Sequence, residues 1–197
     1  LVRERAPLLA DAAAMVGDVQ VRNRGTIGGA IAHADPAADY PAVMMASEAT
    51  FRIAGGTRRR TVRAERMFVD AYTTSLDEGE ILVQVTLPAM RTNTGWSYQK
   101  LANRASRFAV VGVAALVTLA DDGSCARVRI GITGAGPFAT RARAAERYLT
   151  GRVVDDASIA KASASSLAIL SASASCSAVI LSASSFSFAS STIPRTT

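Results

Sequence analysis

Apolar positions change their spacing along the chain, and the change predicts helices first and strands later. Residues 3–16 place alanine, leucine and methionine around polar positions at helical spacing. A second helix is predicted to begin at Asp35 and Pro36, because aspartate caps helix N-termini and proline fits the first helical position. The apolar run 37–47 continues this helix, so the chain is predicted to open with two helices around a glycine-rich connection.

From residue 49 onward, polar and apolar residues alternate, as they do in strands with one buried face. Residues 49–63 predict a hairpin that turns at Gly55–Gly56, and residues 81–88 predict a strand that Pro88 ends. Three further strands and a helix are expected at 96–102, 110–120, 125–135 and 137–151, with a tight turn at 121–123. This order of elements predicts an α+β fold.

Two changes in composition divide the chain. The polar stretch 89–95 separates an α+β unit at 1–90 from a smaller unit of antiparallel strands and one helix at 95–160. From 161 to 197, serine and alanine dominate and charges are nearly absent. Such low complexity is typical of a segment without a packed core, and a shifted reading frame in GC-rich DNA would also produce it. We therefore expect this tail to be unstructured and assign it no role.

The net charge of +6 brings nucleic acid into consideration. Many of the arginines flank the Gly55–Gly56 turn, namely Arg52, Arg58, Arg59, Arg60, Arg63 and Arg66. They come without a recognition helix and without interleaved aromatic residues. This pattern favours a solvated hairpin, or a docking face for an acidic partner, over a nucleic-acid site.

Rare residues exclude several kinds of chemistry. His33 is the only histidine, which argues against histidine-based triads and multi-histidine metal sites. Cys125 and Cys176 stand in unrelated contexts, which indicates two free thiols in a reducing compartment. No apolar run reaches the ~18 residues of a membrane span, and the first residues lack the layout of a secretion signal. The sequence thus predicts a cytoplasmic protein without a membrane span.

One segment, VRNRGTIGGAIAHADPAADYPA at residues 21–42, has more glycine and less side-chain bulk than a core segment needs. The Gly28–Gly29 pair would let main-chain N–H groups approach a phosphate or a flat ring without an intervening Cβ. Thr26 adds a hydroxyl, and Asp39, predicted one turn after Asp35 on the same helix face, can accept hydrogen bonds from sugar hydroxyls. The segment matches neither G-x-G-x-x-G nor the P-loop, so a tight turn packed against a helix is the structural alternative.

Separated motifs occur in an order that points to a known family. The strings RNRGTIGG, ADP, EILVQVTLP, YQKL and RFAVVGVAA follow one another between residues 22 and 115. In this order they resemble the FAD-binding medium subunit of the molybdenum hydroxylases, a family that includes carbon monoxide dehydrogenase and xanthine dehydrogenase. The resemblance runs from the first residues to about residue 160.

The resemblance implies FAD as the cofactor and assigns its contacts residue by residue. The segment 26–30 corresponds to a flavin loop that touches the cofactor through backbone amides, with Ala30 where relatives often have asparagine. Asp39 corresponds to the acid that binds the polyol of the flavin. The implied cofactor-binding residues are Thr26, Ile27, Gly28, Gly29, Ala30, Asp39, Leu82, Tyr98 and Lys100, with no catalytic and no metal-binding side chain.

Three of these assignments place residues near the flavin ring. Leu82 would pack near the isoalloxazine, Lys100 would lie close to the ring, and Tyr98 would stack on it or shield it. Each has an ordinary alternative, because Leu82 would be buried in almost any strand and Lys100 can be a solvated strand charge. His33 is interpreted as a surface or loop residue in preference to a proton shuttle, and Asp35 as a helix cap in preference to a ligand.

The resemblance also implies a role and partners. The protein would receive electrons from iron–sulfur clusters and pass them through FAD to an external acceptor. Its partners would be a large subunit with the molybdenum cofactor and a small 2Fe–2S subunit. The alternatives are a non-catalytic remnant or assembly module of such a complex, and a stand-alone flavin-dependent oxidase or reductase.

One expected feature is missing from the sequence. Family members carry an earlier loop, A-G-G-x-S or A-G-G-T-x, that cradles the pyrophosphate, and no such loop precedes Thr26. Residues 54–57 have these letters but follow Thr26 within the predicted hairpin, so we interpret them as a turn. We therefore expect a truncated start and weaker FAD binding than in a full-length relative.

Overall fold

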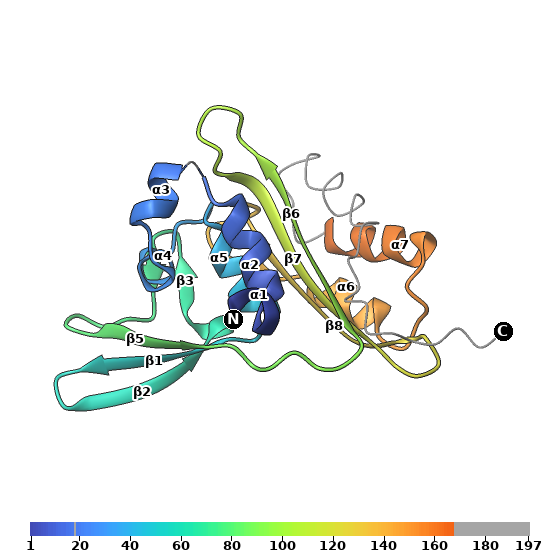
Figure 1. The fold of residues 1–197 in the computed structure, drawn as a ribbon, viewed down its shortest axis with the longest axis horizontal. Coiled ribbons are helices and arrows are strands. Elements are labelled where there is room, and N and C mark those ends of the chain that lie inside the picture. The colour runs from blue at the N-terminus through green and yellow to red at the C-terminus, as the bar shows by residue number, and fades with distance from the viewer. Residues whose placement is uncertain (18, 168–197) are drawn as a thin grey trace.

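The computed structural model describes residues 1–17 and 19–167 (Figure 1). Its helices are α1 (Val2–Arg5), α2 (Pro7–Met15), α3 (Val19–Arg24), α4 (Ile27–His33), α5 (Asp39–Ala46), the 3-10 helix η1 (Ala64–Arg66), α6 (Arg143–Leu149) and α7 (Asp156–Leu167). Its strands are β1 (Thr50–Gly55), β2 (Arg58–Arg63), β3 (Phe68–Asp70), β4 (Thr73–Thr74), β5 (Ile81–Thr86), β6 (Thr94–Ala102), β7 (Ala109–Leu119), β8 (Cys125–Thr133) and β9 (Thr140–Arg141). The predicted α+β class is confirmed.

The strands form separate antiparallel sheets. The largest has the order β6-β7-β8-β9, a second has the order β2-β1-β5, and β3 pairs with β4. The predicted hairpin is the β1–β2 pair, in which Gly55 lies opposite Arg58 and Gly56 turns with a φ of 54°. Residues 54–57 are therefore the end of the hairpin, as the sequence predicts, with Ala54 and Gly55 closing β1 and Gly56 and Thr57 forming the turn. The β1–β2 hairpin and β5 project together from one end of the molecule (Figure 1).

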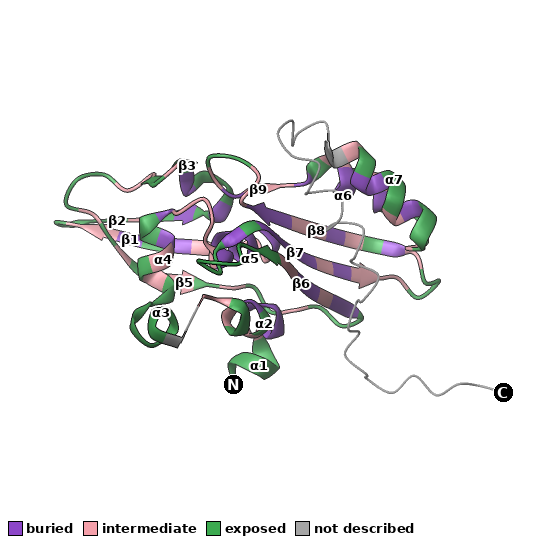
Figure 2. Cartoon of the chain, turned by 90° about the horizontal axis from the view of Figure 1, so that it is seen from above, coloured by how far each residue is buried: buried purple, intermediate pink, exposed green. Residues whose placement is uncertain are grey.

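Two layers of helices enclose the large sheet. Helices α2 and α5 lie against one face, and α6 and α7 cover the other (Figure 1). The continuous apolar run of β7 is explained by this arrangement, because a strand covered on both faces has no solvent-facing side. Buried residues therefore concentrate in α5, β7 and β8 (Figure 2).

Helix α5 is apolar around its whole circumference, which requires burial on every side. Every residue from Pro41 to Ala46 is buried, and so is Asp39 at its first position. The core around α5 includes Phe51 and Met67 from the first part of the chain, and Tyr98 and Ala114 from the large sheet. One continuous core thus joins the segments on either side of residues 89–95.

Several element boundaries differ from those predicted. The second helix begins at Asp39, not at Pro36, because the Asp35 side chain accepts a hydrogen bond from the Ala37 N–H at 2.8 Å and forms a turn instead. The closing helix begins at Arg143, since Thr140–Arg141 pair with β8 as strand β9. Asp39 and Asp35 therefore do not share a helix face.

Some elements carry weak signals and were not predicted, namely α3, β3, β4, η1 and α7. Helix α7 reaches Leu167, inside the segment for which we expected no structure. It begins with mutual hydrogen bonds between Asp155 and Ser158, and Ala162 packs into the core below the sheet. The rest of the serine-rich tail, including Cys176, lies outside the described residues.

A glycine allows α5 to lie directly on β8. A Cβ at Gly131 would stand 2.0 Å from the backbone oxygen of Ala42, a distance that real Cβ atoms do not adopt. On the same strand, the Thr133 hydroxyl lies 2.7 Å from the Pro36 oxygen and 2.8 Å from the Ala38 oxygen. The strand therefore fixes both α5 and the turn that leads into it.

We expect Gly131→Ala to lower the free energy of unfolding by about 1–3 kcal/mol, because the added methyl must displace the α5 backbone. Urea denaturation measures this change. The matched control is Gly136→Ala, since a Cβ at Gly136 meets nothing within 4 Å. Equal stability of the two variants would contradict the close packing of α5 on β8.

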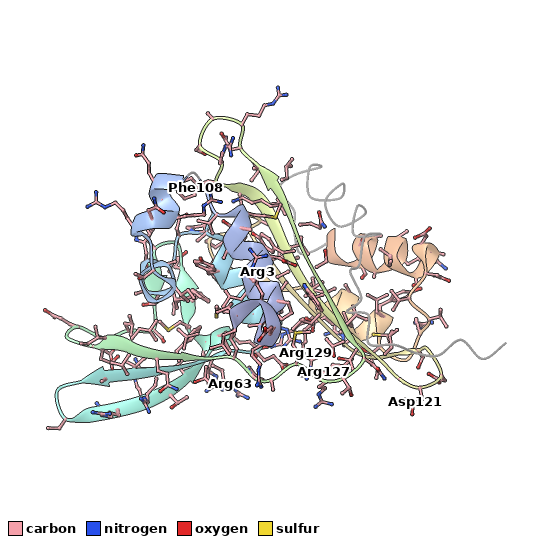
Figure 3. The ribbon with its side chains drawn as sticks, in the orientation of Figure 1. Arg3, Arg63, Phe108, Asp121, Arg127 and Arg129 are labelled. Carbon is pink, nitrogen blue, oxygen red and sulfur yellow. The ribbon has the colours of Figure 1, made fainter. Side chains whose placement is uncertain are left out.

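A cluster of charged residues joins α5 to the edge of the large sheet. Glu48 accepts hydrogen bonds from Arg127, Arg129 and Arg141, and Arg141 also pairs with Glu65 at 2.7 Å and with Glu146. Arg127 and Arg129 lie at the lower end of β8, near the start of the chain (Figure 3). The Arg141 side chain is only 7% exposed, so its charge depends on these carboxylates for solvation.

Candidate functional site

A pocket of about 410 Å³ lies between the helices of the first segment and strand β6. Its walls come from the end of α2, from α3, α4 and α5, from Lys100 of β6 and from Phe108 of the β6–β7 connection. Small-molecule sites in proteins usually span about 300–1,000 Å³, so this pocket can hold a ring system or part of a larger cofactor. It is the candidate binding site.

A buried acid and a buried base meet at the wall of this pocket. The Tyr98 hydroxyl donates to Asp39 Oδ1 at 2.5 Å, and Lys100 Nζ donates to Asp39 Oδ2 at 2.9 Å and to the Met15 oxygen at 3.0 Å. The side chains of Lys100 and Asp39 are 2% and 6% exposed. Gly112 leaves space for this arrangement, since a Cβ there would stand 2.6 Å from the Tyr98 hydroxyl.

Burial sets the protonation of this cluster. It raises the pKa of the Asp39 carboxyl above its ordinary value, while the hydrogen bonds from Tyr98 and Lys100 and the Lys100 charge act in the opposite direction. Burial and the neighbouring Asp39 charge raise the pKa of Tyr98, so its phenol keeps the proton that it donates. A carboxylate has about four lone-pair positions, so Asp39 can still accept from a ligand hydroxyl.

The TIGG segment is the start of a helix, not the loop that the sequence predicted. Thr26 is the N-cap of α4, and its hydroxyl accepts the Gly29 N–H at 2.9 Å. The first amides of a helix have no partner within the helix, so this geometry also presents N–H groups outward. A Cβ at Gly28 would meet nothing within 4 Å, which leaves open space beside the backbone.

The structure gathers some of the predicted cofactor residues around the pocket and places others elsewhere. Thr26, Ala30, Asp39 and Lys100 line the pocket. Ile27, Gly28, Gly29, Leu82 and Tyr98 are not among its lining residues. Tyr98 is part of the core behind Asp39, so it supports the pocket wall, and Leu82 packs against the same core from β5. Lys100 is an ion-pair partner within the protein, not the solvated charge of the ordinary alternative.

Three further residues take positions that the sequence did not specify. His33 ends α4, lines the pocket and packs against the Tyr72 ring with centroids 5.1 Å apart. Arg22 of α3 lines the pocket and donates to the Ala14 oxygen at 2.9 Å. Phe108 lines it from the β6–β7 connection. Arg22 and Phe108 each belong to a string singled out in the sequence, RNRGTIGG and RFAVVGVAA respectively.

Across residues 1–17 and 19–167, histidine, cysteine, aspartate and glutamate form no group of three suited to a metal ion. No helix within these ranges is long and apolar enough to cross a membrane. Cys125 is a buried free thiol in β8, away from the pocket.

Two family descriptions match consecutive parts of the chain. Residues 1–90 match the FAD binding domain in molybdopterin dehydrogenase. Residues 96–179 match the CO dehydrogenase flavoprotein C-terminal domain. The pocket lies where these two matched segments meet, because Asp39 comes from the first and Lys100 from the second.

Relatives of known class share much of this chain. The carbon monoxide dehydrogenase medium chain of Hydrogenophaga pseudoflava is 39% identical over 169 residues, which cover 86% of this chain and 58% of that one. The 6-hydroxypseudooxynicotine dehydrogenase complex subunit alpha of Paenarthrobacter nicotinovorans is 34% identical, covering 82% and 55%. A solved carbon monoxide dehydrogenase from Hydrogenophaga pseudoflava, lacking the Mo-pyranopterin moiety, superposes with a TM-score of 0.84, covering 92% of this chain and 65% of that one.

The fold and the pocket define a flavoprotein with two domains. The first of these belongs to a domain type that binds FAD. Within this class, the chain belongs to the family of FAD-binding medium subunits of the molybdenum hydroxylases. The chain spans a little more than half the length of the curated relatives it matches.

The pocket residues suit part of an FAD molecule. A buried carboxylate with free lone pairs suits a hydroxylated chain, and the first turn of α4, which begins at the pocket-lining Thr26, has amides without helical partners that suit an oxygen-rich group. Ala30 and Phe108 add the apolar surface that a ring system needs. Asp39, Thr26, Ala30 and Lys100 are therefore the residues that would hold the cofactor.

Proposed function

We propose that this protein is the flavin-binding part of a molybdenum hydroxylase and takes part in its oxidoreductase activity. Bound FAD would supply the redox chemistry, taking electrons from iron–sulfur clusters and giving them to an external acceptor. The protein's own residues bind and orient the cofactor and exclude water from one side of it. The observation that carries the proposal is the buried Asp39–Lys100 pair at the wall of the pocket, in which Asp39 belongs to the segment that matches the FAD domain.

The chain's own residues perform three tasks in this proposal. Asp39 accepts hydrogen bonds from the hydroxylated part of the cofactor, and Lys100 and Tyr98 hold its carboxylate in place. Lys100 uses two of its three N–H groups within the protein, which leaves one for the ligand. Thr26 fixes the first turn of α4, so that its amides keep one direction.

The names of the relatives and the thiol of Cys125 support a proposal for the partners and the location. A "medium chain" implies a larger and a smaller chain, which we propose to be a molybdenum-cofactor subunit and a 2Fe–2S subunit. The free thiol of Cys125 supports a cytoplasmic location, where thiols stay reduced. We also propose a division into two domains at 89–95, because one family match ends at residue 90 and the other begins at residue 96.

Titration of the purified chain with FAD tests the proposal. We expect Ala30→Leu to weaken FAD binding by about tenfold or more, because leucine fills pocket volume while remaining a good helix former. Quenching of flavin fluorescence measures the dissociation constant. The control is Asp121→Ala, an exposed change at the far end of the β7–β8 turn (Figure 3), which should leave binding unaltered.

The alternatives predict other results. A chain that never binds FAD yet co-purifies with a molybdenum subunit would be an assembly module. Flavin turnover by the isolated chain with a small substrate would instead favour a stand-alone oxidase or reductase. Binding of FAD that Ala30→Leu leaves unchanged would place the cofactor outside this pocket.

A further inference from the structure

Arginines lie on the two elements that meet at the mouth of the flavin pocket. Arg22 lines the pocket from α3 and Arg24 ends that helix, while Arg104 and Arg107 lie on the β6–β7 connection, which carries the pocket residue Phe108. Within residues 1–17 and 19–167, Arg24, Arg104 and Arg107 form no ion pair with a carboxylate. They differ in this from Arg60, Arg127, Arg129 and Arg141, whose charges are matched by glutamates.

Apolar side chains lie exposed between these arginines. Phe108 is 42% exposed and Val21 is 43% exposed, and both line the pocket. Phe108 lies beside α3, so the β6–β7 connection and α3 face the same opening (Figure 3). We define this surface, Val21 and Phe108 with Arg22, Arg24, Arg104 and Arg107, as the mouth surface.

The charge of the mouth surface has little internal compensation. Besides Arg22, the pocket is lined by Lys100, whose charge Asp39 already matches. The remaining described acid on the pocket wall is Asp35, and it accepts the Ala37 N–H within its own turn. A net positive potential therefore extends from the opening toward solvent.

The arrangement suits a large acidic surface better than a small phosphate. Arg22 is held by the Ala14 oxygen, and the other arginines stand exposed on two separate elements instead of converging on one point. A small apolar centre with a charged rim is the pattern of weak electron-transfer encounters, whose interfaces are the smallest in the range.

We propose that the mouth surface docks an acidic electron-carrier protein, which is the acceptor for electrons leaving the flavin. This inference rests on the proposed function and adds the class of the acceptor. Two one-electron carriers, docking in turn, would together take up two electrons, and two protons would pass to water, so that oxidation of one reduced flavin is balanced.

Binding of an acidic 2Fe–2S ferredoxin to the whole chain tests the proposal by isothermal titration calorimetry, with basic cytochrome c as the probe of opposite charge. The test variant is the double replacement Arg104→Gln and Arg107→Asn, since Arg107 has a φ of 57° that asparagine tolerates. The control is the double replacement Arg58→Gln and Arg59→Gln, which removes the same charge from exposed positions on the β1–β2 hairpin.

We expect the unaltered chain to bind ferredoxin and not cytochrome c at about 0.01 M salt, with clearly weaker binding at about 0.15 M. The Arg104/Arg107 variant should weaken ferredoxin binding by about tenfold, and the hairpin variant by less than about twofold. FAD affinity should be equal in all three proteins. If the chain binds ferredoxin but does not bind FAD, the proposed function is wrong and the docking of ferredoxin is not contradicted.

Three outcomes would overturn the docking proposal. The first is that the unaltered chain does not bind ferredoxin. The second is that the two double variants weaken binding equally, which would indicate charge attraction without a specific site. The third is self-association of the chain that the Arg104/Arg107 variant abolishes, which would assign the mouth surface to a second copy.

Discussion

Replacing Asp39 by alanine is expected to lower the free energy of unfolding by about 3–5 kcal/mol, because the change leaves the Lys100 ammonium buried without its partner. The Tyr98 hydroxyl also loses its acceptor. Urea denaturation of the two proteins, followed by circular dichroism, measures the loss. FAD binding should be lost with it, since the same carboxylate is assigned to the cofactor.

A double replacement separates charge from packing. Asp39→Leu combined with Lys100→Met removes both charges together, and such changes of buried pairs are often neutral for stability. The double variant should therefore be much more stable than Asp39→Ala and should still fail to bind FAD. If the double variant is as unstable as the single one, the loss comes from packing and the charge argument is wrong.

The second large effect is expected at Arg141. Replacing it by methionine leaves the buried Glu146 carboxylate without its cation partner, and should cost about 3–5 kcal/mol. Arg143→Met is the matched control, because Arg143 contacts Glu65, which Arg141 also contacts, at 2.9 Å from a side chain that is 58% exposed. Exposed pairs contribute about 0–1 kcal/mol, so thermal or urea unfolding should distinguish the two variants clearly.

The same cluster gives stability a dependence on pH. Burial alone would raise the pKa of Glu48, but the hydrogen bond from Arg129 and the charges of Arg129, Arg127 and Arg141 outweigh it and lower that pKa. The contribution of Glu48 is therefore complete above its unfolded pKa and is lost as the pH falls through the lower folded value. Unfolding curves across this acidic range should show the loss, and Glu48→Gln should reduce it.

The elements with strong local signals were predictable, and those fixed by long-range contacts were not. Strands β6, β7 and β8 fall within two residues of their predicted ranges, because long apolar runs between turns leave few alternatives. The sequence predicts a loop where α4 lies, because two glycines lower helix propensity. The Thr26 cap offsets them, but a single threonine is a weak sequence signal for the start of a helix. Strand β9 owes its extended form to pairing with β8, which no local pattern reveals.

The candidate site shows the same division. Asp39, Thr26 and Ala30 were chosen from one continuous segment and do line the pocket. The pairing of Asp39 with Lys100 joins residues 61 positions apart, and periodicity gives no information about such a contact. Side chains along β6 point alternately to its two faces. The register with β7, and not the residues next to Tyr98 in sequence, therefore determines that Tyr98 points into the core.

The buried position of α5 has a consequence for protein engineering. This helix belongs to the segment before residue 89, yet its surface is covered by strands that come after residue 95. A split at the polar connection would leave each half with an uncovered apolar face, so the two halves form one cooperative folding unit. Domain exchange between relatives is therefore better made with both segments together, carrying α5 and β8 as a matched pair.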